Sequence, residues 1–234
     1  MTWANVKPEN REVQVEANSE QRRPGRPARL SRAQILAAAL ELADRDGLEA
    51  VTMQRIARAI GAEPMSLYRH VQNKEDLLDG LVDLVFAEIE LPSPDDPWKV
   101  AMRRRAVSVR EALGRHPWAI GLMESRTHPG SATLAYHDAL LANLFAAGFT
   151  ARSGTRVTNI VDSYVYGFAL QEKTLPVSTP EELAALGPEI LAGYAGRYPH
   201  LQTAAEELIA SGFSYGDEFE PGLDLILGAL KRGR

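Results

Sequence analysis

The stretch from Thr52 to Lys74 constrains the fold more than any other part of this 234-residue chain. Apolar residues recur at helical spacing on both sides of Gly61, which marks a tight turn between two short helices, about 52–59 and 63–71. The residues that lock these helices together are Ile56, Ala57, Ile60 and Leu67. Two such helices separated by a three- to four-residue turn have helix-turn-helix spacing, with one face of the second helix held outward.

The rest of the chain also follows the helical period, and no stretch of strand length alternates apolar and polar residues. Ser31 with Gln34 and Thr179 with Glu182 form capping boxes that start helices. The predicted helices are about 31–47, 52–59, 63–71, 74–90, 97–115, 118–125, 131–147, 150–173, 180–192, 199–210 and 217–231. This pattern predicts an all-α fold.

Charge is distributed unevenly along the chain. Residues 21–74 carry ten basic and five acidic side chains, whereas residues 75–234 carry 14 basic and 22 acidic ones. A basic first part joined to an acidic remainder indicates one module that meets a polyanion and another that does not. Arg26 lies in a Pro-Gly-Arg-Pro stretch, which suits either a narrow DNA minor groove or a plain electrostatic tether.

Three segments follow from these patterns: a flexible basic arm over 1–29, a helix-turn-helix DNA-binding domain over 30–75, and a larger helical domain over 76–234, which the family resemblance given below implies to be the ligand-binding and dimerisation domain. The chain has no cysteine, which fits a reducing compartment. It has no apolar run of about 18 residues and no signal-peptide pattern at its start. We therefore expect a cytoplasmic protein with no membrane partner.

Four segments carry a family resemblance. Residues 67–78 read LYRHVQNKEDLL, which is similar to the signature of the tetracycline-repressor (TetR) family of bacterial transcription regulators, and residues 35–42 fit the family's first helix. Residues 113–118, LGRHPW, and 219–228, FEPGLDLILG, resemble the ligand-binding half of its tetracycline-repressor-like branch. The resemblance implies an N-terminal three-helix helix-turn-helix domain and a larger C-terminal helical domain. It also implies a homodimeric repressor on a palindromic operator, released by a small molecule.

The resemblance and side-chain chemistry together give the DNA-binding candidates. They are Arg26, Thr52, Gln54, Arg55, Pro64, Met65, Ser66, Tyr68, Arg69, His70 and Lys74. Gln54 suits bidentate pairing with adenine, Pro64 or Met65 suits a thymine methyl group, and Lys74 suits a phosphate. His70 packing within the small domain, and Arg55 acting as a solubilising charge, stay open as alternatives.

The larger domain's ligand-binding candidates follow from matching positions in the family. They are Arg105, Val109, Met123, His137, Leu140, Leu141, Thr158, Asp162 and Tyr166. The apolar members also suit a plain helical core, whereas buried polar side chains need partners. The positions that anchor a metal in the tetracycline repressor fall near Glu90 and Met123, neither of which is histidine. We therefore expect an apolar or aromatic effector, with no metal and no cofactor.

A dimer would use the helices about 152–173 and 217–231, which would form a four-helix bundle with those of a second copy. No catalytic motif, phosphate loop or metal-ligand spacing is present, so the chain is not expected to be an enzyme. Two alternatives stay open. One is a small helical enzyme that uses His137 or Asp162, and the other is a sequence-tolerant DNA-binding protein that acts through its arm.

Overall fold

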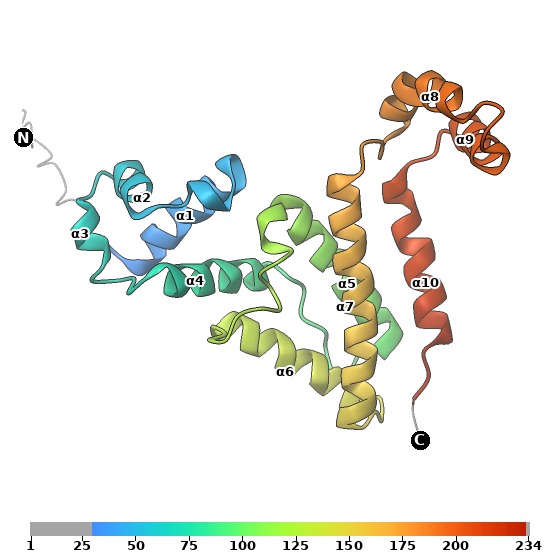
Figure 1. The fold of residues 1–234 in the computed structure, drawn as a ribbon. Coiled ribbons are helices and arrows are strands. Elements are labelled where there is room, and N and C mark those ends of the chain that lie inside the picture. The colour runs from blue at the N-terminus through green and yellow to red at the C-terminus, as the bar shows by residue number, and fades with distance from the viewer. Residues whose placement is uncertain (1–29, 233–234) are drawn as a thin grey trace, which may run out of the picture. The chain divides into compact units, whose positions relative to one another are not determined.

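Ten α-helices and three short 3-10 helices make up residues 30–232, the part of the chain that this computed structural model describes, and no strand occurs in that part (Figure 1). The α-helices are α1 (Arg32–Asp46), α2 (Met53–Ile60), α3 (Pro64–Leu67), α4 (Lys74–Ala87), α5 (Trp98–Arg115), α6 (Ser131–Ala146), α7 (Ala151–Thr174), α8 (Pro180–Tyr194), α9 (Pro199–Ser211) and α10 (Phe219–Ala229). The 3-10 helices are η1 (Leu48–Ala50), η2 (Pro117–Ala119) and η3 (Tyr215–Glu218). The all-α prediction is confirmed. The predicted arm, with Arg26, lies outside the described residues.

The helix starts follow the sequence signals. Ser31 accepts a hydrogen bond from the backbone N–H of Gln34, whose side chain accepts one from the backbone N–H of Ser31, so the predicted capping box of α1 is present. Thr179 forms the same motif with Glu182 at the start of α8. Gly61 ends α2 at a φ of 65°, a left-handed conformation that glycine adopts without a steric penalty.

Two predicted helices, 63–71 and 118–125, do not form as the sequence suggested. The α-helix α3 stops at Leu67, and hydrogen-bonded turns carry the chain on to Val71. The guanidinium of Arg32 donates to the backbone carbonyl of His70 at 3.0 Å, and this contact from another helix holds the turn. The expected helix over 118–125 is also absent, because η2 supplies a single turn and further turns follow it.

The main core lies in the larger part of the fold, among α4, α5, α6, α7 and α10. Its largest fully buried apolar or aromatic side chains include Phe86, Met102, Leu113, Tyr136, Leu140 and Phe219. The first three helices form a smaller unit against α4, centred on Ile35, Ile56 and Leu67. The helix α4 therefore contacts both the small unit and the main core.

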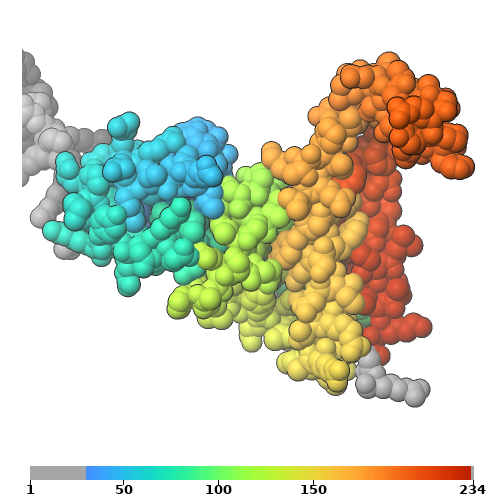
Figure 2. Space-filling view, in the orientation of Figure 1, coloured from blue at the N-terminus to red at the C-terminus, as the bar shows by residue number. Residues whose placement is uncertain are grey.

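The helices α8 and α9 pack chiefly on each other and stand out at the surface in orange (Figure 2). Leu183 and Gly187 of α8 are buried, whereas α9 has no buried residue. None of the helices described here has both the length and the apolarity needed to cross a membrane.

Candidate nucleic-acid interface and interior polar cluster

The outer face of the helix-turn-helix unit carries most of the predicted DNA-binding residues. Thr52, Gln54, Arg55, Met65, Tyr68, Arg69 and Lys74 are exposed, and Pro64, Ser66 and His70 are half-buried. Met65 is 76% exposed and Tyr68 is 47% exposed, which are high values for apolar side chains of this size. Large apolar side chains left open beside basic ones suit a surface that a partner covers.

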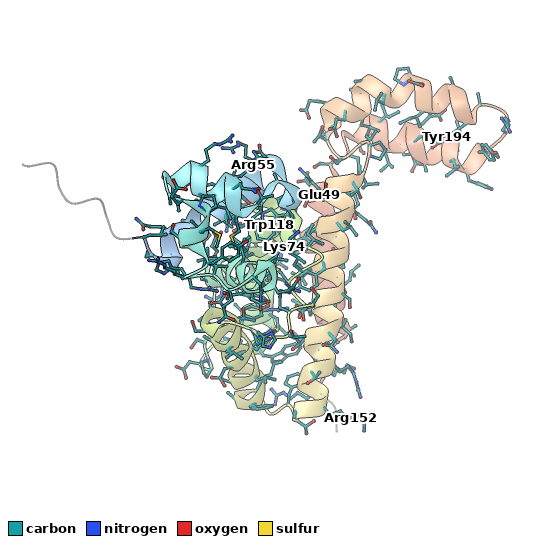
Figure 3. The ribbon with its side chains drawn as sticks, turned by 60° about the vertical axis from the view of Figure 1, so that its left-hand side comes forward. Glu49, Arg55, Lys74, Trp118, Arg152 and Tyr194 are labelled. Atoms are coloured by element: carbon teal, nitrogen blue, oxygen red, sulfur yellow. The ribbon has the colours of Figure 1, made fainter. Side chains whose placement is uncertain are left out.

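A groove of about 380 Å³ lies between η1, the start of α2, the end of α3 and the start of α4. Thr52, Tyr68 and Lys74 line it together with Gln72 and Asn73. The caps of α2 and α4 therefore face the same groove. Free backbone N–H groups and the positive end of a helix dipole favour an anion at such helix starts. Figure 3 labels Lys74, which lies at the start of α4.

Two of the candidates are already engaged within the chain. The guanidinium of Arg55 is hydrogen-bonded to the carboxylate of Asp46, so it would have to exchange that partner for a phosphate. The hydroxyl of Ser66 donates to the backbone carbonyl of Glu63 at 2.6 Å and remains half-buried. Gln54, by contrast, is exposed on α2.

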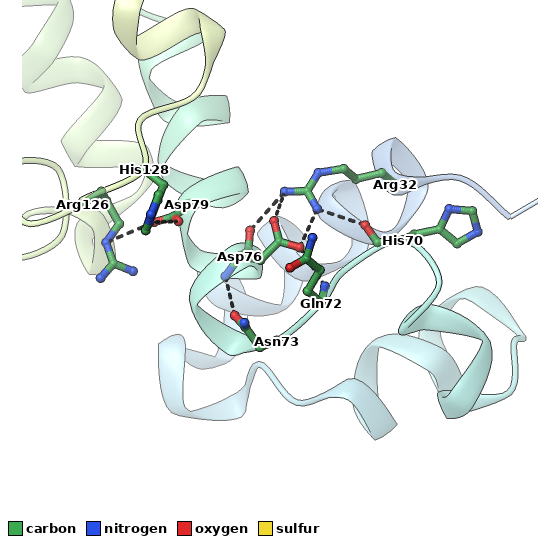
Figure 4. A network of polar contacts seen from close by, with 8 residues as sticks. All are labelled: Arg32, His70, Gln72, Asn73, Asp76, Asp79, Arg126 and His128. Carbon is green, nitrogen blue, oxygen red and sulfur yellow. Dashed lines mark hydrogen bonds and ion pairs between the residues drawn. The ribbon is translucent and has the colours of Figure 1, made fainter.

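A polar network that the sequence did not reveal fixes the groove in place (Figure 4). The Arg32 guanidinium donates to both carboxylate oxygens of Asp76, at 3.0 and 2.7 Å, as well as to the carbonyl of His70. The carboxylate of Asp76 also accepts from the backbone N–H of Gln72 at 2.7 Å. Hydrogen bonding from Arg32 lowers the pKa of Asp76, although partial burial opposes this. The pair ties the start of α1 to the start of α4, next to Lys74.

The helix α4 also holds the segment that leads into α6. Arg126 forms ion pairs with Glu75 and Asp79, and Asp83 accepts hydrogen bonds from the backbone N–H and the hydroxyl of Thr133 at 2.8 and 2.9 Å. The cap residue of α6 is Gly130, which has no side chain to accept from the first turn. Asp83 supplies that acceptor from another helix.

A third polar cluster joins α1 to η2. The ring of His116, only 5% exposed, has Nδ1 2.7 Å from a carboxylate oxygen of Asp44 and Nε2 3.0 Å from one of Glu88. The indole N–H of Trp118 donates to the same Asp44 oxygen at 2.7 Å. Burial tends to raise the pKa of Glu88, but hydrogen bonds from Arg115 and His116 lower it overall. This cluster connects the small unit to the larger one.

The interior of the larger part contains a buried guanidinium. Arg105, on α5, is fully buried; it donates to the carboxylate of Asp162 on α7 at 2.6 Å and to the hydroxyl of Tyr136 on α6. Burial tends to lower the pKa of Arg105, but interactions with Tyr136 and Asp162 raise it overall. Burial raises the pKa of Tyr136 to about 12 and also raises that of Tyr166, so both phenols are neutral near pH 7.

The structure brings together only some of the predicted ligand-binding residues. Arg105 and Asp162 are in direct contact, and Tyr166 donates to Glu124 at 2.8 Å. The half-buried His137 lies 5.1 Å from the Tyr136 ring, measured between ring centroids. Met123, Val109 and Leu140 belong to the buried core, Leu141 is half-buried, and the hydroxyl of Thr158 is hydrogen-bonded to the Gly154 carbonyl.

Tyr136 and Glu124 were not among the candidates. Tyr136 precedes His137 and lies one helical turn before Leu140, so an inward position on α6 follows from periodicity. Its pairing with Arg105 has no signal in the sequence, because the two residues are 31 positions apart.

Comparisons with known proteins found matches to both parts of the described chain. Residues 35–81 match the family model described as bacterial regulatory proteins, tetR family, and residues 91–233 match that of the tetracyclin repressor-like C-terminal domain. An HTH-type transcriptional regulator of Saccharopolyspora erythraea is 31% identical, over 86% of this chain and 84% of its own. The HTH-type transcriptional repressor DrrR1 of Streptomyces coeruleorubidus is 30% identical, over 90% and 81%. The crystal structure of ActR from Streptomyces coelicolor in complex with actinorhodin has a TM-score of 0.72 at 24% identity, covering 87% of this chain and 96% of ActR.

Proposed function

The chain belongs to the TetR family of bacterial regulatory proteins, and on that premise we propose that it is a ligand-responsive transcriptional repressor that binds a palindromic operator as a homodimer. The relatives from Saccharopolyspora and Streptomyces coeruleorubidus are named for regulation and repression of transcription. In this proposal the chain acts as a regulator and catalyses no reaction. A cytoplasmic location, where operator DNA lies, follows from this function.

The observation that carries the proposal is the groove shared by the starts of α2 and α4. Thr52 and Lys74 offer it a hydroxyl and a cation, and Tyr68 closes its side. A DNA backbone phosphate in this groove would receive charge-assisted hydrogen bonds, and α3 would then face a major groove. Met65 and Tyr68 would meet the bases, while residues 30–75 act as the DNA-binding domain.

Homodimer formation is supported by apolar side chains that are exposed in the single chain. Ile160 and Leu170 on α7 and Leu225 on α10 are 39%, 50% and 78% exposed. A Cβ added at Gly167 or Gly228, on the same two helices, would meet nothing within 4 Å in this chain. We propose that a second copy covers this face. The α3 helices of the two copies would then lie about one DNA turn, 34–36 Å, apart.

Release by a small molecule is the second half of the proposal. Residues 76–234 would hold the effector among α5, α6 and α7, and the ActR structure contains actinorhodin within a similar fold. An effector that binds the released form better lowers operator affinity by the same factor, because the two equilibria are linked. The polar contacts of α4 with both units provide a physical connection between the two sites.

The test is a footprint on DNA upstream of the protein's own gene, followed by titrations at several salt concentrations. Lys74→Ala should weaken binding to all duplexes alike and reduce the slope of log K against log salt by about one. Arg197→Ala removes an exposed cation from the turn between α8 and α9, outside the groove and outside α7 and α10, and serves as the control. Tyr68→Ala should change the preference among operators. Equal effects of Lys74→Ala and Arg197→Ala, or equal binding of operator and random duplex, would contradict the proposal.

A further inference from the structure

His116 lies between two carboxylates that come from different parts of the fold. Its Nδ1 atom is 2.7 Å from an oxygen of Asp44, near the end of α1, and its Nε2 atom is 3.0 Å from an oxygen of Glu88, the residue that follows α4. The ring is only 5% exposed, so water has little access to either nitrogen. We call these three residues the His116 bridge. It joins α1, in the small unit, to η2 in the larger part.

The geometry of the bridge requires a proton on each ring nitrogen. An ionised carboxylate only accepts hydrogen bonds, and a neutral imidazole carries one N–H, so a neutral ring would turn a lone pair toward one of the two carboxylates. Burial tends to raise the pKa of Glu88, but hydrogen bonds from Arg115 and His116 lower it overall, so this carboxyl group is ionised near neutral pH. Only the imidazolium form of His116 therefore satisfies both contacts.

The charges in contact with the bridge favour that cation. Asp44 lies in the last turn of α1 and Glu88 directly follows α4, so both carboxylates are at the C-terminal, negative ends of helix dipoles. The opposing charge is that of Arg115, whose guanidinium donates to Glu88 at 2.7 Å. Two carboxylates and two helix ends thus offset the cost of burying the charged ring, against one guanidinium.

The other charged side chains near η2 change this balance little. Pro117, next to His116, lines a small pocket together with Arg110, Glu172 and Lys173. Arg110 donates to Glu172 at 3.0 Å, so these two charges compensate each other. Lys173 is exposed, and solvent therefore screens its charge.

We propose that the His116 bridge is a pH-sensitive connection that fixes the small unit against the larger one, and that operator binding weakens when the ring loses a proton. Because operator binding is one of its readouts, this inference rests in part on the proposed function. A unit held in one orientation loses less freedom when it binds. A unit freed from the bridge samples orientations in which the two α3 helices of a dimer are wrongly spaced. Proton uptake and operator affinity are therefore linked.

The first measurement needs no DNA. Thermal unfolding of the full-length protein is followed from about pH 6 to pH 8, where histidine side chains change charge and carboxyl groups stay ionised. The stabilising effect of the bridge is present at the acid end, where both nitrogens carry protons, and is lost as the pH rises. We expect the melting temperature of the native protein, relative to that of His116→Gln, to fall by roughly 3 °C or more across this range.

The most informative variant is Glu88→Gln, at a side chain that is 34% exposed and so tolerates the change. The new amide both donates and accepts, so a neutral ring can donate to Asp44 and accept from the amide. The contacts then no longer need the second proton, and the pH dependence that the bridge causes should disappear while the fold is kept. A purely structural role for His116 would leave the pH profile of Glu88→Gln the same as that of the native protein.

Operator binding is then measured at constant ionic strength on the DNA identified by footprinting. We expect the affinity of the native protein, relative to that of Glu88→Gln, to fall at least about threefold from pH 6 to pH 8. His70 is among the DNA-binding candidates and also titrates, but it is present in both proteins, so the comparison removes its contribution. His200→Gln, at an exposed site on α9, is the control and should follow the native protein.

The two assays separate this inference from the proposed function. Identical pH profiles of the native protein and Glu88→Gln, or a native operator affinity that does not change with pH, would overturn the bridge. A pH-dependent melting temperature that Glu88→Gln abolishes, in a protein with no footprint on any duplex, would refute the repressor and keep the bridge as a pH-sensitive contact. A clear footprint whose pH dependence is the same in the native protein, Glu88→Gln and His116→Gln would refute the bridge and keep the repressor.

Discussion

The Arg32–Asp76 pair allows a quantitative test of how the DNA-binding unit is held together. We predict that Asp76→Ala lowers the free energy of unfolding by about 2 kcal/mol at pH 7, because it removes two charge-assisted hydrogen bonds from Arg32 and the acceptor for the Gln72 N–H. The side chains of Arg32 and Asp76 are 40% and 27% exposed, so solvent screening keeps the effect below that of a fully buried pair.

The assay is thermal unfolding together with urea titration. For a domain of this size, about 2 kcal/mol corresponds to a decrease of roughly 4–8 °C in the melting temperature. Arg45→Ala is the matched control, because Arg45 is also on α1 and pairs with an aspartate, Asp46, but it is 65% exposed and joins no second helix. Because solvent screens such an exposed pair, the control should leave the melting temperature close to that of the native protein.

The pH dependence gives an independent check. Because the pKa of Asp76 is lowered in the folded protein, its stabilising effect is present above the unfolded-state pKa of about 3.9 and is lost as the pH falls below it. The stability difference between the native protein and Asp76→Ala should be constant from about pH 7 to pH 5 and should narrow below about pH 4. Equal destabilisation by Asp76→Ala and Arg45→Ala, or a difference that does not narrow in acid, would refute the reasoning.

Three further predictions concern other parts of the fold. Gly61→Ala should lower the unfolding free energy by about 1 kcal/mol in urea titrations, because the position has a φ of 65° and the added methyl group meets nothing within 4 Å; an unchanged midpoint would contradict this. Asn143→Leu should lower it by about 2–3 kcal/mol, since the buried Asn143 amide donates to two loop carbonyls that would lose their partner. Leu225→Asp should dissociate the proposed dimer in sedimentation experiments, whereas Leu134→Asp, at an exposed site on α6, should leave the mass unchanged.

The sequence was most informative where the structural signal is local. Capping boxes, the turn glycine and the helical period gave the class of fold and most helix positions within a few residues. The end of α3 was missed because it depends on Arg32, 38 residues away from the His70 carbonyl that it holds. A helix was wrongly predicted over 118–125 because the short turn that forms there has the same apolar spacing as a helix.

The candidate sites followed the same rule. The exposure of the candidate positions on the helix-turn-helix unit could be predicted because it follows from helical spacing, and most of these positions are exposed; their contact with DNA stays a prediction. Arg105 and Asp162 were named from the family resemblance, but their contact joins two helices 57 residues apart. Tyr136, Asp76 and His116 contact partners that are distant in the sequence. Composition and helical spacing do not predict such contacts.

The ring of His116 has a practical consequence for anyone who exchanges recognition modules between relatives of this protein. A graft cut between residues 75 and 76 would separate Asp44 from the His116 and Trp118 that it contacts, and Arg32 from Asp76. A chimaera that keeps its response to the effector must therefore transplant these matched partners as sets, wherever the junction is drawn.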